Sequence, residues 1–67
     1  TMHITVNGRA LEIEPGRTLH DLIISMNLDP SVVVAELNHD IVPGEKFAAT
    51  GLYAGDQLEL LSFVGGG

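Results

Sequence analysis

Apolar and polar side chains alternate along residues 2–6 and again along residues 11–14. A period of two is that of a strand with one buried face. Between the two runs stands Asn7-Gly8, which suits a type I′ turn because both central positions of that turn need a positive φ. The sequence therefore predicts that the chain opens with a β-hairpin, which Pro15-Gly16 ends.

A helical period follows the hairpin. One apolar stripe at positions i, i+3, i+4 and i+7 is formed by Leu19, Leu22, Ile23 and Met26. Thr18 and Asp21 resemble a capping box, with Asp in place of the usual Glu. We expect the helix to end near Asn27, because the proline three positions later disfavours helical geometry just before it. Met26 is expected in the core.

The second half of the chain reads as short strands and turns. The patterns predict an interior strand covered by the helix at 32–37, a polar turn at 38–40, a brief strand at 41–42, a helical turn at 45–49 and a final strand at 57–64. Phe47 and Leu52 are expected to close the core. One helix packed on one sheet is a two-layer α+β domain, with the last strand placed beside the first.

The final strand predicts a contact surface as well as a core. Leu58 and Leu60 share one face, whereas Glu59, Leu61 and Phe63 share the other. Two apolar side chains beside a glutamate suggest that Leu61 and Phe63 dock on a partner. A twisted or bulged strand could instead bury one of them, or they could be isolated surface residues.

Composition excludes several classes of function. The chain has no cysteine and therefore no disulfide or thiolate chemistry. Its net charge of −6 argues against nucleic acid as a partner; it suits either a basic protein surface or solubility alone. No apolar run is long enough to cross a membrane, no signal peptide is visible, and we expect a cytoplasmic protein.

The side chains do not form a recognisable catalytic or metal site. His3, His20 and His39 fall in three different predicted elements without metal-ligand spacing. No phosphate-binding loop or serine motif is present. We therefore expect no catalyst, no bound cofactor and no metal. The remaining unusual group is the carboxylate of Gly67, which follows two further glycines; such an end is either frayed or suited to a narrow channel.

Three stretches, together with the order of elements, point to a known family. They are Asn38-x-x-Ile41-Val42-Pro43, Gly55-Asp56-Gln57-Leu58-Glu59 and Phe63-Val64-Gly65-Gly66. The chain from Met2 onward resembles the sulfur carrier proteins of thiamine biosynthesis, the ThiS family. Two positions differ from the usual family pattern: Gly44 stands where Arg is common and Phe47 where Trp is common.

The resemblance implies a ubiquitin-like β-grasp fold over residues 2–64, a mixed sheet of four to five strands on one main helix, with a flexible tail at 65–67. It also implies that a ThiF-like adenylating enzyme uses ATP and magnesium to activate Gly67. Sulfur from a cysteine desulfurase system then gives a thiocarboxylate, which thiazole synthase consumes. Gly65 and Gly66 would thread the end into the partner.

Two other functions fit the same pattern. One is a sulfur carrier of the same fold for another pathway, such as molybdopterin or another sulfurated metabolite. The other is a non-covalent regulatory β-grasp module whose tail is inert. A ubiquitin-type role built on lysine-linked chains fits poorly, because Lys46 is the sole lysine.

Overall fold

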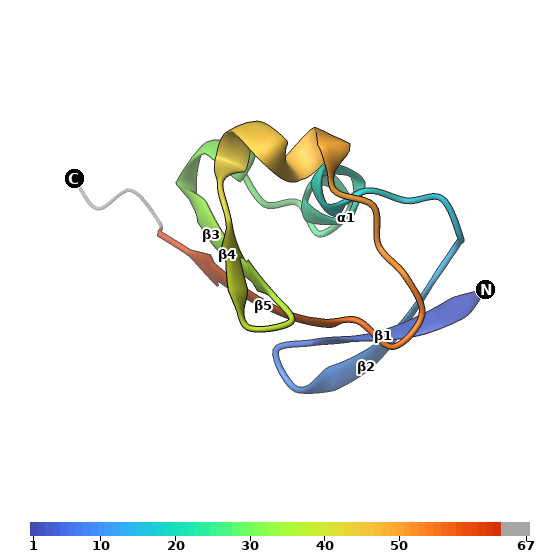
Figure 1. Cartoon of the computed structure of the whole chain (residues 1–67). Coiled ribbons are helices and arrows are strands. Elements are labelled where there is room, and N and C mark those ends of the chain that lie inside the picture. The colour runs from blue at the N-terminus through green and yellow to red at the C-terminus, as the bar shows by residue number, and fades with distance from the viewer. Residues whose placement is uncertain (64–67) are drawn as a thin grey trace.

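The computed structural model describes residues 1–63, which form a five-stranded mixed sheet with one main helix (Figure 1). The elements in chain order are β1 (Met2–Val6), β2 (Arg9–Ile13), α1 (Leu19–Ser25), the 3₁₀ helix η1 (Pro30–Val32), β3 (Val33–Leu37), β4 (Asp40–Val42), the 3₁₀ helix η2 (Gly44–Ala49) and β5 (Gln57–Ser62). The predicted two-layer α+β architecture is confirmed, and its order matches the β-grasp fold.

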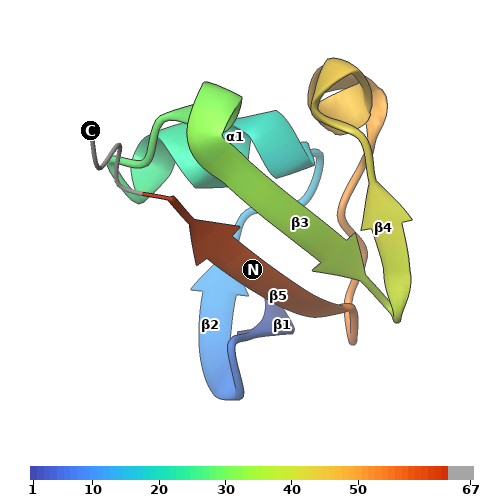
Figure 2. The ribbon, with the colours of Figure 1, turned by 90° about the vertical axis from the view of Figure 1, so that its left-hand side faces the viewer.

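The strands lie in the order β2-β1-β5-β3-β4. β5 is parallel to β1 and antiparallel to β3, while the two hairpins β1–β2 and β3–β4 are antiparallel. The last strand therefore enters the middle of the sheet beside the first, as predicted. Figure 2 shows β5 between β3 and the first hairpin.

Both hairpin turns use left-handed backbone. Asn7 and Gly8 have φ values of 51° and 81°, which confirms the predicted turn. Asn38 and His39 repeat this geometry with φ values of 50° and 74°. The polar turn is therefore one residue shorter than predicted, and Asp40 opens β4.

The helix begins with the predicted capping box. The Asp21 backbone N–H donates to Thr18 Oγ1 at 3.1 Å, and the Thr18 N–H donates to Asp21 Oδ2 at 3.0 Å. At the other end, α1 stops at Ser25, two residues before the predicted end. The prediction that Met26 is buried is wrong. Met26 is the C-cap with 40% of its surface exposed, because the chain turns away at Asn27, whose φ is 60°.

The core lies between the sheet and the layer formed by α1 and η2. Figure 1 shows α1 and η2 on the same side of the sheet, and the two elements contact each other. The buried apolar residues are Ile4, Val6, Leu19, Leu22, Ile23, Val33, Ala35, Phe47, Leu52, Leu58 and Leu60. Phe47 and Leu52 are almost fully enclosed, which confirms their predicted role in closing the core.

One expectation about β3 is wrong in part. The strand is interior, between β5 and β4, as predicted. The helical layer covers only one of its faces, however, so Val33 and Ala35 are buried while Val34 is 42% exposed. The β-branched run therefore alternates in burial even though it does not alternate in composition.

The final strand is shorter than its predicted range. β5 ends at Ser62, and the backbone N–H of Phe63 then donates to the Val32 carbonyl at 2.9 Å. Val64 and the predicted tail residues Gly65, Gly66 and Gly67 lie outside the described residues. Within residues 1–63, no helix is long and apolar enough to cross a membrane.

Candidate functional site

β5 carries two different surfaces on its two faces. Leu58 and Leu60 point into the core and are 1% and 8% exposed. Leu61 lies on the other face and is 58% exposed, and Phe63, directly after the strand, is 55% exposed. The alternative in which a twist or bulge buries one of this pair is therefore excluded. Their role in docking stays a prediction.

Two further apolar side chains extend this exposed surface. Val34 is the direct cross-strand partner of Leu61. Ile41 of β4 is 62% exposed and lies opposite Glu36 of β3. We call Val34, Ile41, Leu61 and Phe63 the outer apolar patch. It lies on the sheet face opposite the core and ends where the described chain ends.

Two carboxylates lie within this surface. Glu36 of β3 and Glu59 of β5 are direct cross-strand partners, so they occupy the same face at the same level of the sheet. A hollow of about 370 Å³ is lined by both glutamates and by Val34, Ile41 and Leu61. The outer face thus combines negative charge with exposed apolar area.

An asparagine from the first hairpin holds the exit end of β5. Asn7 Nδ2 donates to the Leu60 carbonyl at 3.2 Å, and the Leu60 N–H donates to Asn7 Oδ1 at 2.8 Å. The backbone N–H of Asn7 donates to the Leu58 carbonyl at 2.9 Å. The amide side chain therefore continues the parallel ladder after β1 has turned away. It fixes the backbone of β5 at Leu60, near the C-terminal end of the strand.

A second asparagine holds the opposite end of β5 in the same way. The backbone N–H of Asn38 donates to the Gln57 carbonyl at 2.7 Å, and the Gln57 N–H donates to Asn38 Oδ1 at 2.9 Å. Asn38 Nδ2 also donates to Asp56 Oδ1 at 3.0 Å. Both hairpin turns thus use their first residue to hold the same strand, and β5 is fixed at both ends.

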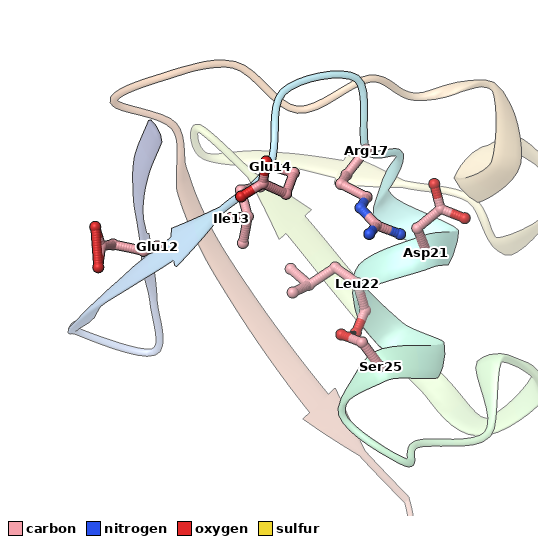
Figure 3. Close-up of a pocket in the computed structure, with 7 residues that line it drawn as sticks. All are labelled: Glu12, Ile13, Glu14, Arg17, Asp21, Leu22 and Ser25. Carbon is pink, nitrogen blue, oxygen red and sulfur yellow. Dashed lines mark hydrogen bonds between the residues drawn. The ribbon is translucent and has the colours of Figure 1, made fainter. Parts of the chain in front are cut away.

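A separate hollow of about 260 Å³ lies between the end of β2 and the start of α1 (Figure 3). Two of its polar side chains, Asp21 and Ser25, are already hydrogen-bonded. The backbone N–H of Thr18 holds the pKa of Asp21 below its ordinary value, and Ser25 Oγ donates to the Leu22 carbonyl at 2.7 Å. Figure 3 shows Glu12 pointing away from the hollow. These residues form no nucleophile and base pair.

The histidines remain in separate elements. His3 lies on β1 with its Nε2 atom 3.5 Å from Glu12 Oε2 of β2, and both side chains are exposed. His20 is on α1 and His39 is in the second turn. Residues 1–63 contain no group of three side chains that could hold a metal ion.

Sequence reasoning missed Val34, Ile41 and both asparagine contacts. Val34 and Ile41 carry no signal of exposure, because each sits in a short apolar run. Their exposure follows from the pairing register of β3 with β4 and β5. The asparagines were visible only as turn formers; their contacts with β5 depend on residues at separations of 19 to 53 positions.

Comparisons of the sequence and of the structure with known proteins indicate the same family. The profile described as the ThiS family matches residues 4–67. The chain is 30% identical over 66 residues to the sulfur carrier protein ThiS of Escherichia coli, covering 98% of this chain and all of the relative.

A longer enzyme is also similar. A thiazole synthase of Paramagnetospirillum magneticum is 32% identical over 66 residues, which is 98% of this chain. This chain spans only 20% of that protein's length.

A solved structure agrees with the sequence comparison. The crystal structure of the thiamine biosynthesis protein ThiS from Geobacter metallireducens superimposes with a TM-score of 0.79 at 33% identity. The match covers 98% of this chain and the whole of that one.

Proposed function

The chain belongs to the ThiS family, and from this premise we propose that it is the sulfur carrier for thiazole formation in thiamine biosynthesis. The observation that carries the proposal is the family match, which runs from residue 4 to residue 67 and so includes the glycine end. It extends over a fold in which β5 leads from the core to that end. The protein acts as a co-substrate and not as a catalyst.

The proposed chemistry takes place at the carboxylate of Gly67. A carboxylate resists nucleophiles until one of its oxygens becomes a good leaving group. Attack of a carboxylate oxygen on the α-phosphorus of ATP releases pyrophosphate and gives an acyl-adenylate. A sulfur nucleophile then displaces AMP, and one oxygen of the original carboxylate leaves with it. When that nucleophile is the persulfide of the desulfurase system, the product is an acyl disulfide. A free thiol, such as cysteine, then breaks the S–S bond, which leaves the thiocarboxylate on Gly67 and the donor sulfur in a new disulfide.

The glycines suit this chemistry for steric reasons. Gly67 has no side chain to hinder attack on its carbonyl carbon, and Gly65 with Gly66 can enter a channel too narrow for larger residues. Leu61 and Phe63 would contact the partner at the mouth of that channel. Fixation of β5 by Asn7 gives the body a defined geometry behind the tail.

Thiazole synthase is the partner with the strongest support. A thiazole synthase from Paramagnetospirillum magneticum includes a segment similar to almost all of this chain within a protein five times as long. Joining a carrier to its acceptor enzyme in one chain raises their effective concentration. The ThiF-like adenylating enzyme, which would use ATP and magnesium, and the cysteine desulfurase system follow from the family's chemistry and complete the set of proposed partners.

The test is conversion of the terminal carboxylate in vitro. The chain is incubated with the ThiF-like enzyme of the same genome, ATP, magnesium, cysteine and a desulfurase, and intact-mass spectrometry follows the product. We expect the mass change for exchange of one oxygen for sulfur, located on Gly67 by fragmentation.

Two controls define the outcome. The reaction without ATP, and a chain lacking Gly66 and Gly67, should both leave the mass unchanged. No mass change with an enzyme shown to be active, or the same change in the truncated chain, would refute the proposal. Return of the thiocarboxylate to a carboxylate on addition of thiazole synthase and its other substrates would test the acceptor.

A further inference from the structure

Two carboxylates face each other on the outer face of the sheet. Glu36 and Glu59 are direct partners in the antiparallel β3–β5 pair, where like charges destabilise the pairing. Within residues 1–63, the single close contact between a basic and an acidic side chain joins His3 to Glu12, so neither Glu36 nor Glu59 has an ion-pair partner there. The free protein therefore holds an unfavourable charge pair on its outer face.

Apolar side chains surround this charge pair. Ile41 lies opposite Glu36 on β4, and Val34 and Leu61 form the next cross-strand pair toward the tail. Together they line the hollow of about 370 Å³. When a partner covers these apolar side chains, water leaves the hollow. The attraction between a cation of the partner and the two carboxylates then becomes stronger.

We propose that this outer face docks on thiazole synthase through an arginine of the enzyme that binds Glu36 and Glu59 together, inside a ring of apolar contacts. A guanidinium is planar and carries five N–H donors, so it can serve two carboxylates at once, which a single ammonium does less well. The net charge of −6 complements a basic face. The choice of thiazole synthase rests on the proposed function and on the relative that joins both sequences in one chain.

The proposal has a distinctive consequence for stability and binding. In the free protein, neutralising one glutamate relieves repulsion and should stabilise the fold. In the complex, the same change removes half of the cation's site and should weaken binding. Stability and affinity should therefore move in opposite directions. A residue with only a structural role would not produce this opposition.

The experiment compares three variants of the full chain. Glu59→Gln and Glu36→Gln neutralise the pair, while Glu12→Gln removes the same charge from the outer face of β2, two strands away from β5. Affinity for thiazole synthase is measured by calorimetric titration at low and high salt, and Tm by circular dichroism. We expect about tenfold weaker binding for either pair variant, with a smaller salt dependence. We also expect a Tm rise of roughly 1–5 °C.

Several results would overturn the proposal. Unchanged affinity in both pair variants would do so, as would an equal loss in Glu12→Gln, which would indicate a general charge effect. Loss of affinity for the adenylating enzyme alone would show that the occupant is wrong. If Glu59→Gln is fully thiocarboxylated by saturating adenylating enzyme and binds thiazole synthase normally, the surface proposal fails while the proposed function stands. If the wild type is never thiocarboxylated, the proposed function fails independently of this binding result.

Discussion

Leu58 and Leu61 are identical side chains three residues apart on one strand, yet they have opposite environments. Leu58 is 1% exposed and Leu61 is 58% exposed. The difference arises because the helical layer covers only one face of the sheet. The inner face of β5 thus supplies the core, whereas the outer face is not needed for folding. The outer apolar patch is the surface that we propose for docking, because neighbouring exposed apolar side chains often mark a binding site.

The largest expected effect is a difference in stability between alanine variants of the two leucines. Leu58→Ala should lower the free energy of unfolding by about 2–5 kcal/mol, because it leaves a cavity in the core. Leu61→Ala should change it by less than about 0.5 kcal/mol, since the side chain is mainly in water. Urea denaturation of both variants measures the difference. Equal losses would show that the two faces contribute alike and would remove the basis of the comparison.

The next effect concerns binding by the outer face. Phe63→Asp should weaken association with the partner enzyme by about tenfold or more, because it places a charge where an apolar contact forms. The fold should persist, since Phe63 is 55% exposed. Titration of the partner gives the affinity, and circular dichroism checks the fold. Phe63→Leu is the matched control, which keeps an apolar side chain and should retain most of the affinity.

A smaller effect tests how β5 is held between its two faces. Asn7→Gly and Asn38→Gly both keep a residue that tolerates the positive φ and remove only the amide. Asn7→Gly should cost about 1–2 kcal/mol, because it leaves both polar backbone groups of Leu60 without their partner. Asn38→Gly should cost less, since its contacts are exposed.

Chemical denaturation and hydrogen exchange distinguish the two asparagines. Exchange at Leu60 should accelerate in Asn7→Gly alone, and exchange at Gln57 in Asn38→Gly alone. If both variants loosened the whole strand equally, β5 would be a single unit and not a strand fixed separately at each end.

The smallest effect lies outside both faces. Hydrogen bonds from the backbone N–H groups of Thr18 and Ser31 hold the pKa of Asp21 and of Asp29 below the ordinary value of 3.8. Because these carboxyls bind protons more weakly in the folded state, their stabilisation is present above pH 3.8 and is lost as the pH falls through the lowered values.

Asp21→Asn should therefore flatten the fall in stability as the pH drops below 3.8, relative to the wild type. Thermal unfolding across this range measures it. The variant should bind thiazole synthase normally near neutral pH, because the cap of α1 is remote from the outer apolar patch. Reduced binding would show that the partner surface extends to the helix.

Much of this architecture is readable because its signals are local. The alternation around Asn7-Gly8, the Thr18 and Asp21 pair and the apolar stripe of α1 each lie within a few residues. The prediction of burial fails where the apolar stripe passes the end of the helix. Met26 continues the stripe, but the helix has already ended, so the side chain is exposed instead of buried.

The sequence likewise predicts one part of the candidate site and not the other. Alternation along β5 is sufficient to place Leu61 and Phe63 opposite the core, and their exposure is confirmed. The same alternation places Glu59 on this face, but Val34, Ile41 and Glu36 could not be added from sequence, because they join this surface through strand pairing. A shift of one residue in the register of β3 would turn each of its side chains to the opposite face.

The sequence alone determined the elements, the two-layer class and the faces of the final strand, since hydrophobic period and turn chemistry act over a few residues. The resemblance of short stretches to the ThiS family also lies in the sequence. Tertiary structure decided which strand faces are covered, which carboxylates face each other and which asparagines hold β5. These features depend on chain segments brought together from up to 53 positions apart, and only the closed sheet sets their register.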